Sequence, residues 1–413
     1  MSRAFGFIPV VPPFAGAGQN EVVVAAYMER MTALGGARWT ADDLNDPAPL
    51  VYVMATGGTE GALLALYEQR QALVPGEPVV LLAHPGNNSL PASLEVLARL
   101  QQDGAQGRIV YLRGADDERG LAALDEALHD VGVRSALRSA RIGLVGAPSD
   151  WLVASSPDPA VVSDVWGPEV VSIPLEELDS AMEAASGEAV AIGAASLAGG
   201  ATDTVEPSAA DLSEVSRVHE GLRRLVAEHR LDALTLRCFD IVLARGTSGC
   251  FALSELTDAG VISGCEGDLV STVGLMWAKL LTGEVPWMAN PSEVDEDANA
   301  LVLAHCTVPR TLVESYRLRS HFESGLGIGI QGQLPLGPVT LLRIGGSMMD
   351  ALWLAEGEVV STGDAENLCR TQVRVALSRG SVGDLLLAPL GNHIVLVYGH
   401  HADRLAGWWE GML

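Results

Sequence analysis

The chain has 413 residues, of which 48% are hydrophobic, and a formal net charge of −26 from 52 acidic and 26 basic residues. This length predicts two or three domains with a sizeable buried core. The acidic balance argues against nucleic acid and anionic membrane surfaces as partners, because both are themselves negatively charged. No apolar run reaches the ~20 residues of a membrane-spanning helix, and the N-terminus lacks the basic start of a signal peptide, so we expect a cytoplasmic protein.

In chain order, the first segment, 1–16, is expected to form a buried strand. Apolar strands then alternate with helices, a pattern typical of a parallel sheet covered on both faces. We predict strands at 49–56, 78–84, 108–114 and 141–148, and helices at 60–73, 91–104 and 118–132.

The predicted secondary structure changes from alternating strands and helices to strands alone at about residue 305. From about 149 a second α/β unit is expected, with a helix over 208–230 and a strand over 233–239. Beyond 305 the segments alternate like antiparallel strands of a barrel, with helices no longer expected. The predicted fold is therefore two Rossmann-like α/β domains with parallel sheets, 1–148 and 149–304, followed by a C-terminal antiparallel β-barrel domain, 305–413. The predicted barrel strands are 310–322, 337–345, 350–360, 369–377 and 393–399.

Two polar turns follow neighbouring predicted strands. The carboxyl ends of neighbouring parallel strands lie together, so these turns are candidates for binding a substrate hydroxyl or anion. Tight turns with helix caps are an equally good interpretation. The candidate substrate-binding residues here are Thr56, Gly57, Gly58, Thr59, Glu60, His84, Asn87 and Asn88.

The stronger constellation begins with "GCEGDL", which places Glu266 and Asp268 between two apolar stretches. Asp268 is in the position of an N-cap for the following helix, whereas a cap leaves Glu266 unexplained. His305 and His321 lie at the ends of predicted strands, where they are either ordinary buried histidines or part of a metal site. Glu323, two residues after His321, would point to the same face of a strand. Carboxylates with one or two imidazoles suit Mn²⁺, Mg²⁺, Co²⁺ or Fe²⁺.

The segment from Gly264 to Cys306 resembles the central part of the L-fucose isomerase family, which is related to L-arabinose isomerases. "CRTQVRVAL" with "GNHIVLVYG" resembles that family's C-terminal motif. "TGGTE" and "HPGNNSLPASLEVLARL" resemble the N-terminal domain of its shorter members.

This resemblance implies two α/β domains and a β-barrel, a homo-oligomer (trimer or hexamer), and a divalent cation, usually Mn²⁺. The cation's glutamate falls on Glu266 and its histidine on His393. The family's aspartate falls on Asn290, whose amide oxygen can bind a cation but cannot accept a proton. Glu293 is the alternative carboxylate. We therefore expect Glu266, Asn290 and His393 at the metal and catalytic site, with His305, His321 and Glu323 among the substrate-binding residues.

The function expected from this resemblance is aldose–ketose isomerisation of a small sugar-like molecule by proton transfer through an enediol. This reaction needs a base and a Lewis acid. Two alternatives stay open: a lyase or epimerase acting on a sugar-like metabolite, and a non-catalytic sugar-binding protein with the same fold. If the substrate is phosphorylated, Arg343, Arg370 and Arg374 are candidates to bind it.

Overall fold

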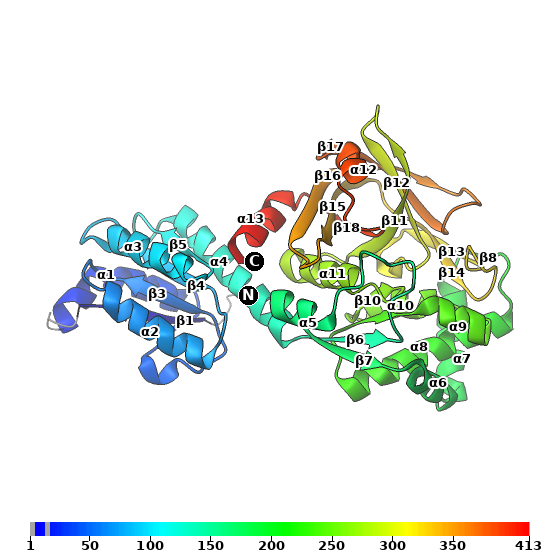
Figure 1. Ribbon diagram of the computed structural model, residues 1–413, viewed down its shortest axis with the longest axis horizontal. Coiled ribbons are helices and arrows are strands. Elements are labelled where there is room, and N and C mark those ends of the chain that lie inside the picture. Colours follow the sequence, from blue (N-terminus) through cyan, green and yellow to red (C-terminus); the bar gives the residue numbers. More distant parts are fainter. Residues whose placement is uncertain (1–4, 13–16, 413) are drawn as a thin grey trace. The chain divides into compact units, whose positions relative to one another are not determined.

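The computed structural model describes residues 5–12 and 17–412, and this part of the chain forms two compact units (Figure 1). The N-terminal unit comprises Met1–Ala136 with Gly407–Leu413, and the large unit comprises Leu137–Ala406. Residues 1–4 and 13–16 of the predicted first strand segment lie outside the described residues. The division into three domains stays a prediction.

A five-stranded parallel sheet with the order β2-β1-β3-β4-β5 forms the N-terminal unit. Because side chains alternate between the faces of a strand, β1, β3, β4 and β5 each contribute apolar side chains to two cores. One core packs the sheet against α1 and α4, and the other packs it against α2 and α3. The elements are β1 (Phe5–Val10), α1 (Ala17–Ala33), β2 (Gly36–Arg38), β3 (Leu50–Met54), α2 (Glu60–Leu73), β4 (Val79–Ala83), α3 (Ser89–Gln102), β5 (Gly107–Tyr111) and α4 (Glu118–Ser139).

The second parallel sheet, in the large unit, has the order β10-β9-β6-β7. The predicted strand at 141–148 is β6, and it pairs with β9 and β7 of this sheet rather than with the first one. The predicted helix over 208–230 is α8. The elements of this part are β6 (Arg141–Val145), β7 (Glu169–Ile173), α6 (Leu175–Glu183), α7 (Gly187–Gly200), α8 (Ala209–His229), β9 (Ala233–Leu236), α9 (Cys238–Arg245), α10 (Cys250–Asp258), β10 (Ile262–Cys265) and α11 (Leu269–Thr282).

A closed antiparallel barrel of six strands, in the order β11-β12-β17-β16-β15-β18, completes the large unit. Its interior is filled by the apolar side chains that alternate along these strands. A further small sheet, β14-β13-β8, lies outside the barrel. The barrel strands are β11 (Trp287–Asp295), β12 (Ala300–His305), β15 (Gly337–Gly345), β16 (Ala351–Gly363), β17 (Thr371–Arg379) and β18 (Ile394–Tyr398), and the small sheet consists of β8 (Asp203–Thr204), β13 (Ser315–Arg319) and β14 (Gly329–Gln333).

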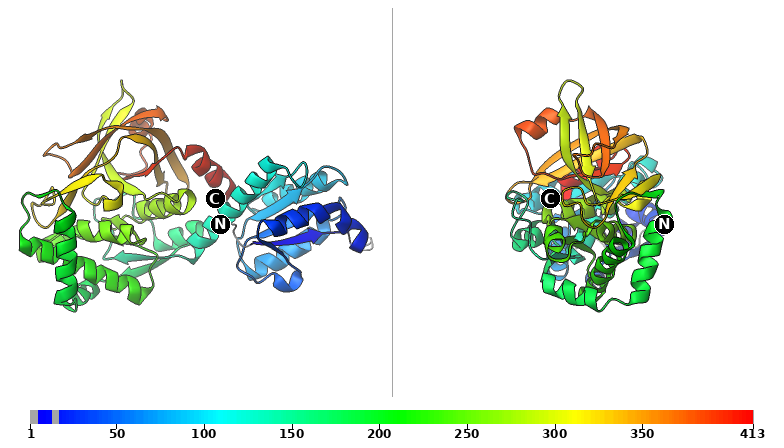
Figure 2. Two further views of the ribbon diagram at one scale, coloured as in Figure 1. Left: turned by 180° about the vertical axis from the view of Figure 1, so that it is seen from behind. Right: turned by 90° about the vertical axis from the view of Figure 1, so that its right-hand side faces the viewer.

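Helix α11 connects the two halves of the large unit. It contacts β9 and β10 of the parallel sheet on one side and β15 and β18 of the barrel on the other (Figures 1 and 2). This placement brings the start of α11 close to the end of the barrel where β18 begins.

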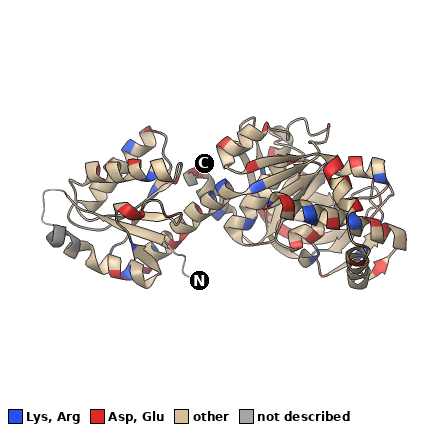
Figure 3. Ribbon diagram, turned by 90° about the horizontal axis from the view of Figure 1, so that it is seen from below, with Lys and Arg blue, Asp and Glu red and all other residues tan. Residues whose placement is uncertain are grey.

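The predicted fold class is confirmed: parallel-sheet α/β domains precede a closed antiparallel barrel. One detail was wrong: helices continue beyond residue 305, as α12 (Val382–Leu387) and α13 (Ala402–Met412). Within the described residues, no helix combines the length and apolarity needed to span a bilayer. Acidic residues occur in elements of both units (Figure 3).

Candidate metal and substrate site

The turn between β10 and α11 places Glu266 in an unusual backbone conformation. Its φ is 63°, in the left-handed region that non-glycine residues rarely adopt. Gly267 follows with a φ of 73°, and a Cβ there would lie 2.5 Å from the carbonyl oxygen of Ala147. The Glu266 carbonyl accepts a 2.8 Å hydrogen bond from the amide of Ser149. Such strained residues concentrate at functional sites.

Asp268 caps α11, as the sequence predicts, and also belongs to a buried polar cluster. Its carboxylate accepts hydrogen bonds of 2.7 Å from both the backbone amide and the hydroxyl of Ser271. The Arg343 guanidinium lies 3.4 Å away. Asp268 is fully buried, and burial alone would raise the pKa of its carboxyl. Arg343 and His393 outweigh the effect of burial and lower this pKa, so the carboxyl stays ionised.

His393 stands immediately before β18, beside the start of α11. Its Nδ1 lies 2.8 Å from Asp268 Oδ2, and its Nε2 lies 3.7 Å from Glu266 Oε1. The imidazole is fully buried, and among the described residues its Nε2 has no hydrogen-bond partner. A buried ring nitrogen without a partner is costly, and a carboxylate that orients a histidine through its other nitrogen is typical of metal ligands.

His305 completes the cluster from the end of β12. Its Nδ1 contacts the Thr307 hydroxyl at 2.8 Å, which leaves Nε2 as the nitrogen that could bind a cation. The His305 ring centroid lies 5.6 Å from that of His393. Glu266, His305 and His393, here called the His–His–Glu trio, each offer one ligand atom within 4.8 Å of the others. One carboxylate and two imidazoles suit a divalent cation such as Mn²⁺, Fe²⁺ or Co²⁺, whereas Mg²⁺ and Ca²⁺ prefer sites made of oxygen ligands alone.

The two histidines of the trio differ in their pKa. Burial by itself would lower the pKa of His393, but Asp268 and Glu266 outweigh it and raise the value to about 9. Burial, together with the neighbouring His393, lowers the pKa of His305 to about 4. Burial would raise the pKa of Glu266, but His393 and the Trp151 indole outweigh it and lower it. The metal-free trio therefore carries an ionised carboxylate between one charged and one neutral imidazole at neutral pH.

A cavity of about 310 Å³ opens onto Glu266. The Trp151 indole Nε1 donates a 2.6 Å hydrogen bond to Glu266 Oε2, and the edge of the Trp151 ring lies against Phe239 with centroids 4.9 Å apart. The volume is at the lower end of the range for small-molecule sites. The lining residues are Trp151, Phe239, Glu266, Asn290, Glu323 and Asn392.

The structure brings Asn290 to this cavity, on β11, and takes Glu293 away from it. Glu293 lines a separate cavity on the barrel, together with Arg374. His305 belongs to the trio, and its expected role in substrate binding stays a prediction. The assignment of Asn290 to the metal and to catalysis stays a prediction.

His321 and Glu323 do not lie on a strand, so the expectation that they share a strand face was wrong. They lie in the loop between β13 and β14, where the His321 carbonyl accepts a 2.8 Å hydrogen bond from Gly325 and closes a turn. Glu323 lines the cavity, whereas the His321 ring contacts Ser324 and faces Phe239 at 5.4 Å.

The two polar turns of the N-terminal unit come together, as predicted from neighbouring strands. The amide of Gly57 donates a 2.7 Å hydrogen bond to the carbonyl of Asn87. His84 is buried, with its Nε2 3.1 Å from the Ala55 carbonyl and its Nδ1 3.0 Å from that of Pro85. Thr59, at the start of α2, is also buried. A substrate-binding role for Thr56, Gly57, Gly58, Thr59, Glu60, His84, Asn87 and Asn88 stays a prediction.

Three lining residues were not found from the sequence: Trp151, Phe239 and Asn392. Trp151 follows β6 and Phe239 follows β9, so both stand just beyond the carboxyl ends of parallel strands. Ligands of open α/β sheets bind at that edge. This rule would have selected them if the strand order had been known.

Comparison with known proteins finds similarity to proteins named sulfoquinovose isomerase. The chain is 26% identical over 215 residues to the one from Alkalicoccus urumqiensis, covering 51% of this chain and 48% of the relative. It is 24% identical over 194 residues to those from Priestia aryabhattai and Priestia megaterium, covering 45% of this chain and 43% of each relative. The match thus spans about half the length of these curated relatives. No family model matches the chain.

Proposed function

We propose that the protein is a divalent-metal-dependent isomerase that interconverts an aldose and a ketose. The observation that carries this proposal is the buried Nε2 of His393, which has no hydrogen-bond partner among the described residues and lies 3.7 Å from Glu266 beside a sugar-sized cavity. The similarity to proteins named as sugar isomerases supports the same reaction class. A manganese cofactor, a homo-oligomer and a cytoplasmic location are further parts of the proposal that rest on the sequence.

In this proposal Glu266, His305 and His393 hold the cation, with Asn290 as an additional oxygen ligand. A bound divalent cation supplies Lewis-acid stabilisation of the negative charge that develops on the substrate oxygens. Asp268 accepts a hydrogen bond from Nδ1 of His393, so that Nε2 is the nitrogen available to a cation held between His393 and Glu266.

Proton transfer between the two carbons of the enediol is assigned to Glu266. Its carboxylate lines the cavity and is ionised at neutral pH, because its pKa is lowered. Trp151 donates a hydrogen bond to Oε2 of Glu266 and thereby fixes the orientation of the carboxylate group. Asn290 cannot take this role, since an amide accepts no proton.

The test is incubation of Mn²⁺-loaded protein with a panel of aldoses in D₂O, followed by NMR. The proposal predicts a ketose product with deuterium incorporated at the carbon that exchanges its proton. Cleavage to smaller fragments would identify a lyase, and a C2 epimer without ketose would identify an epimerase. Either of those products, or Mn²⁺ binding without any turnover, would overturn the isomerase proposal.

A further inference from the structure

We propose that Cys238 and Cys265 are a modification site: a small hydroperoxide converts the two thiols to a disulfide, which lowers the affinity of the neighbouring metal site. Disulfide formation depends on the geometry of the two thiols alone. Its effect on metal binding rests on the proposed function, because Glu266 follows Cys265 directly in the chain.

The two thiols are in contact inside the large unit. Their Sγ atoms lie 3.2 Å apart, and Cys238 and Cys265 are both free cysteines with side chains only 4% and 3% exposed. A disulfide has an S–S length of about 2.05 Å, so the two sulfurs need to approach by only about 1 Å. Small rotations of the two side chains are enough for this approach.

Backbone hydrogen bonds hold the two cysteines opposite each other. Cys265 ends β10 and pairs with Leu236 of β9, and Cys238 begins α9 two residues later. The amide of Gly267 donates to the Leu236 carbonyl at 3.1 Å, so the pairing of the two strands continues past Cys265. The Cys265 carbonyl accepts a further hydrogen bond, also 3.1 Å, from the amide of Asp268. The thiols are therefore presented by a fixed framework.

Each cysteine adjoins a residue that lines the cavity beside the trio. Phe239 follows Cys238, Glu266 follows Cys265, and both line the cavity of about 310 Å³. Hydrogen peroxide is only slightly larger than water, so a cavity of this size gives it a path to the residues next to both thiols. The Trp151 indole bonds to Glu266 and its ring lies against Phe239, so this side chain connects the two parts of the lining.

The oxidation takes two steps. One thiol releases its proton and its sulfur attacks an oxygen of hydrogen peroxide; the O–O bond breaks and leaves a sulfenic acid and one water. The second sulfur then attacks the sulfenic sulfur, the S–S bond forms, the S–O bond breaks, and the hydroxide leaves with the second thiol's proton as another water. Two thiols thus pass two electrons to one peroxide. A small dithiol reverses the reaction by thiol–disulfide exchange.

The S–S bond draws Cys265 toward the start of α9. Glu266 has little freedom to compensate, because its φ of 63° is rarely adopted and its carbonyl is held by the amide of Ser149. Its carboxylate therefore shifts relative to His393, whose Nε2 lies 3.7 Å away. Metal–ligand distances tolerate only about 0.2 Å, so the disulfide weakens the cation site.

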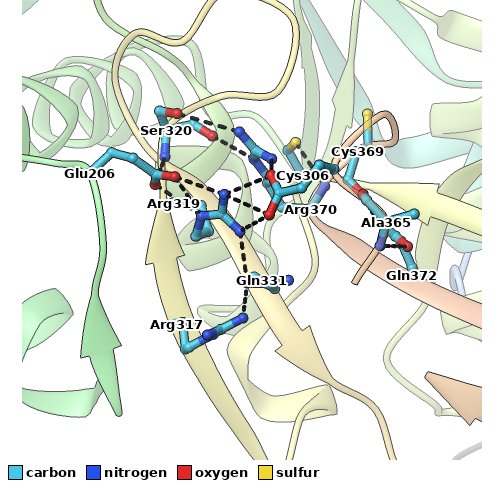
Figure 4. Close-up of polar contacts among 11 residues, drawn as sticks. Glu206, Cys306, Arg317, Arg319, Ser320, Gln331, Ala365, Cys369, Arg370 and Gln372 are labelled. Carbon is cyan, nitrogen blue, oxygen red and sulfur yellow. Dashed lines mark hydrogen bonds and ion pairs between the residues drawn. The ribbon is translucent and has the colours of Figure 1, made fainter. Parts of the chain in front are cut away.

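The other cysteines supply the competing products and a control. Of the five cysteines, all of them in the described part of the chain, Cys369 alone is partly exposed. Its carbonyl accepts a 3.0 Å hydrogen bond from the Gln372 side chain, which closes the turn before β17 (Figure 4). Cys306 interacts with Cys250 and Cys369, and its Sγ accepts a 3.5 Å hydrogen bond from the amide of Arg370 (Figure 4). A disulfide at Cys306 is therefore the alternative product.

The first test maps the disulfide in metal-free wild type and Cys369→Ser after treatment with hydrogen peroxide. The proteins are alkylated under denaturing conditions and cut with trypsin and a glutamate-specific protease. Cleavage after Arg245 and Glu255 places the five cysteines on different peptides. We expect the peptides of Cys238 and Cys265 to be joined, lighter by two hydrogens, in both proteins. A disulfide at Cys306, oxidation of Cys369 alone, or five alkylated thiols in wild type would overturn the proposal.

The second test is calorimetric titration with Mn²⁺ of reduced, oxidised and re-reduced protein, after the reagents are removed. We expect the affinity of wild type to fall by at least ~10-fold on oxidation and to recover on reduction. Cys238→Ser should bind Mn²⁺ like reduced wild type before and after peroxide. Cys265→Ser repeats the comparison from the other thiol, so the result does not depend on the folding of one variant.

Unchanged affinity in wild type that carries the disulfide, or an equal loss in Cys238→Ser, would overturn the effect on the metal site. If reduced wild type binds no Mn²⁺, the proposed function fails and this effect fails with it. The peptide map decides the disulfide in either case, so the two failures are distinguishable.

Discussion

Asp268 and His393 are joined by a 2.8 Å contact between Oδ2 and Nδ1, although 125 residues separate them in the chain. The same carboxylate accepts from the first turn of α11 through Ser271. One side chain therefore ends a loop, begins a helix and orients the imidazole that faces Glu266. The position of the proposed cation ligand is thus determined by the packing of α11 against the barrel.

Asp268→Asn tests this coupling, because asparagine caps helices about as well as aspartate but lacks the charge. We expect the affinity for Mn²⁺ to fall by about 10- to 100-fold, the usual effect of losing a carboxylate behind a ligating histidine. Ser271→Ala is the control: it removes contacts to Asp268 and Arg343 without touching His393, so stability should fall while Mn²⁺ affinity stays within about threefold. Equal Mn²⁺ affinity in wild type and Asp268→Asn would show that the carboxylate does not support the site.

Comparing substitutions of His305 and His321 tests which of these histidines binds the cation. Both are buried histidines close to the cavity, but His305 belongs to the trio and His321 contacts Ser324. We expect His305→Gln to lose at least ~100-fold in Mn²⁺ affinity, and His321→Gln to bind Mn²⁺ nearly as wild type. Isothermal titration of both variants decides this, and the reverse order would remove His305 from the metal site.

The raised pKa of His393 predicts how stability depends on pH without metal. The folded value is about 9, above the ordinary value of ~6.5, so the folded state holds the proton more tightly. The resulting stabilisation, on the order of 3 kcal/mol, is fully present below about pH 6.5 and is lost as pH rises through about 9.

Urea unfolding of metal-free protein between pH 6 and 10, for wild type and His393→Gln, measures this effect as the difference between the two. A difference that shrinks toward pH 10 is expected. A difference independent of pH would mean that His393 is not protonated in the folded metal-free protein.

Asn290→Asp tests whether this position faces the cation. A carboxylate there would add negative charge beside the trio, so we expect Mn²⁺ to bind about 10-fold more tightly. Asn392→Asp, at an exposed position that lines the same cavity, is the control and should change the affinity less. If both substitutions have the same effect, the gain comes from general electrostatics and Asn290 is no ligand.

Much of the fold follows from local sequence patterns. The runs "LVYVM" and "VVLLA" are wholly apolar, and both are fully buried strands of a parallel sheet. The strand β6, however, joins the second sheet, because its partners β9 and β7 lie later in the chain. Periodicity reports burial and element type but not the strand with which a segment pairs.

The site was predictable in part for the same reason. Glu266 stood out because a carboxylate between apolar segments needs an explanation, and Asp268 because caps have a local pattern. Trp151 and Thr307 carry no such signal: they matter only because the fold places them against Glu266 and His305. Whether His305 was an ordinary buried histidine or a ligand depended on its distance from His393, which no local pattern encodes.

The central claim is that Glu266, His305 and His393 hold a divalent cation, and Mn²⁺ affinity tests it most directly. The measurement is metal content of the purified protein and calorimetric titration with Mn²⁺, for wild type, Glu266→Gln and His393→Ala, with Glu358→Gln as a charge-matched control. We predict one tight site per chain in wild type and the control, lost in both variants of the trio. Equal affinity in all four proteins, or no binding in wild type, would contradict the metal site and with it the proposed isomerase.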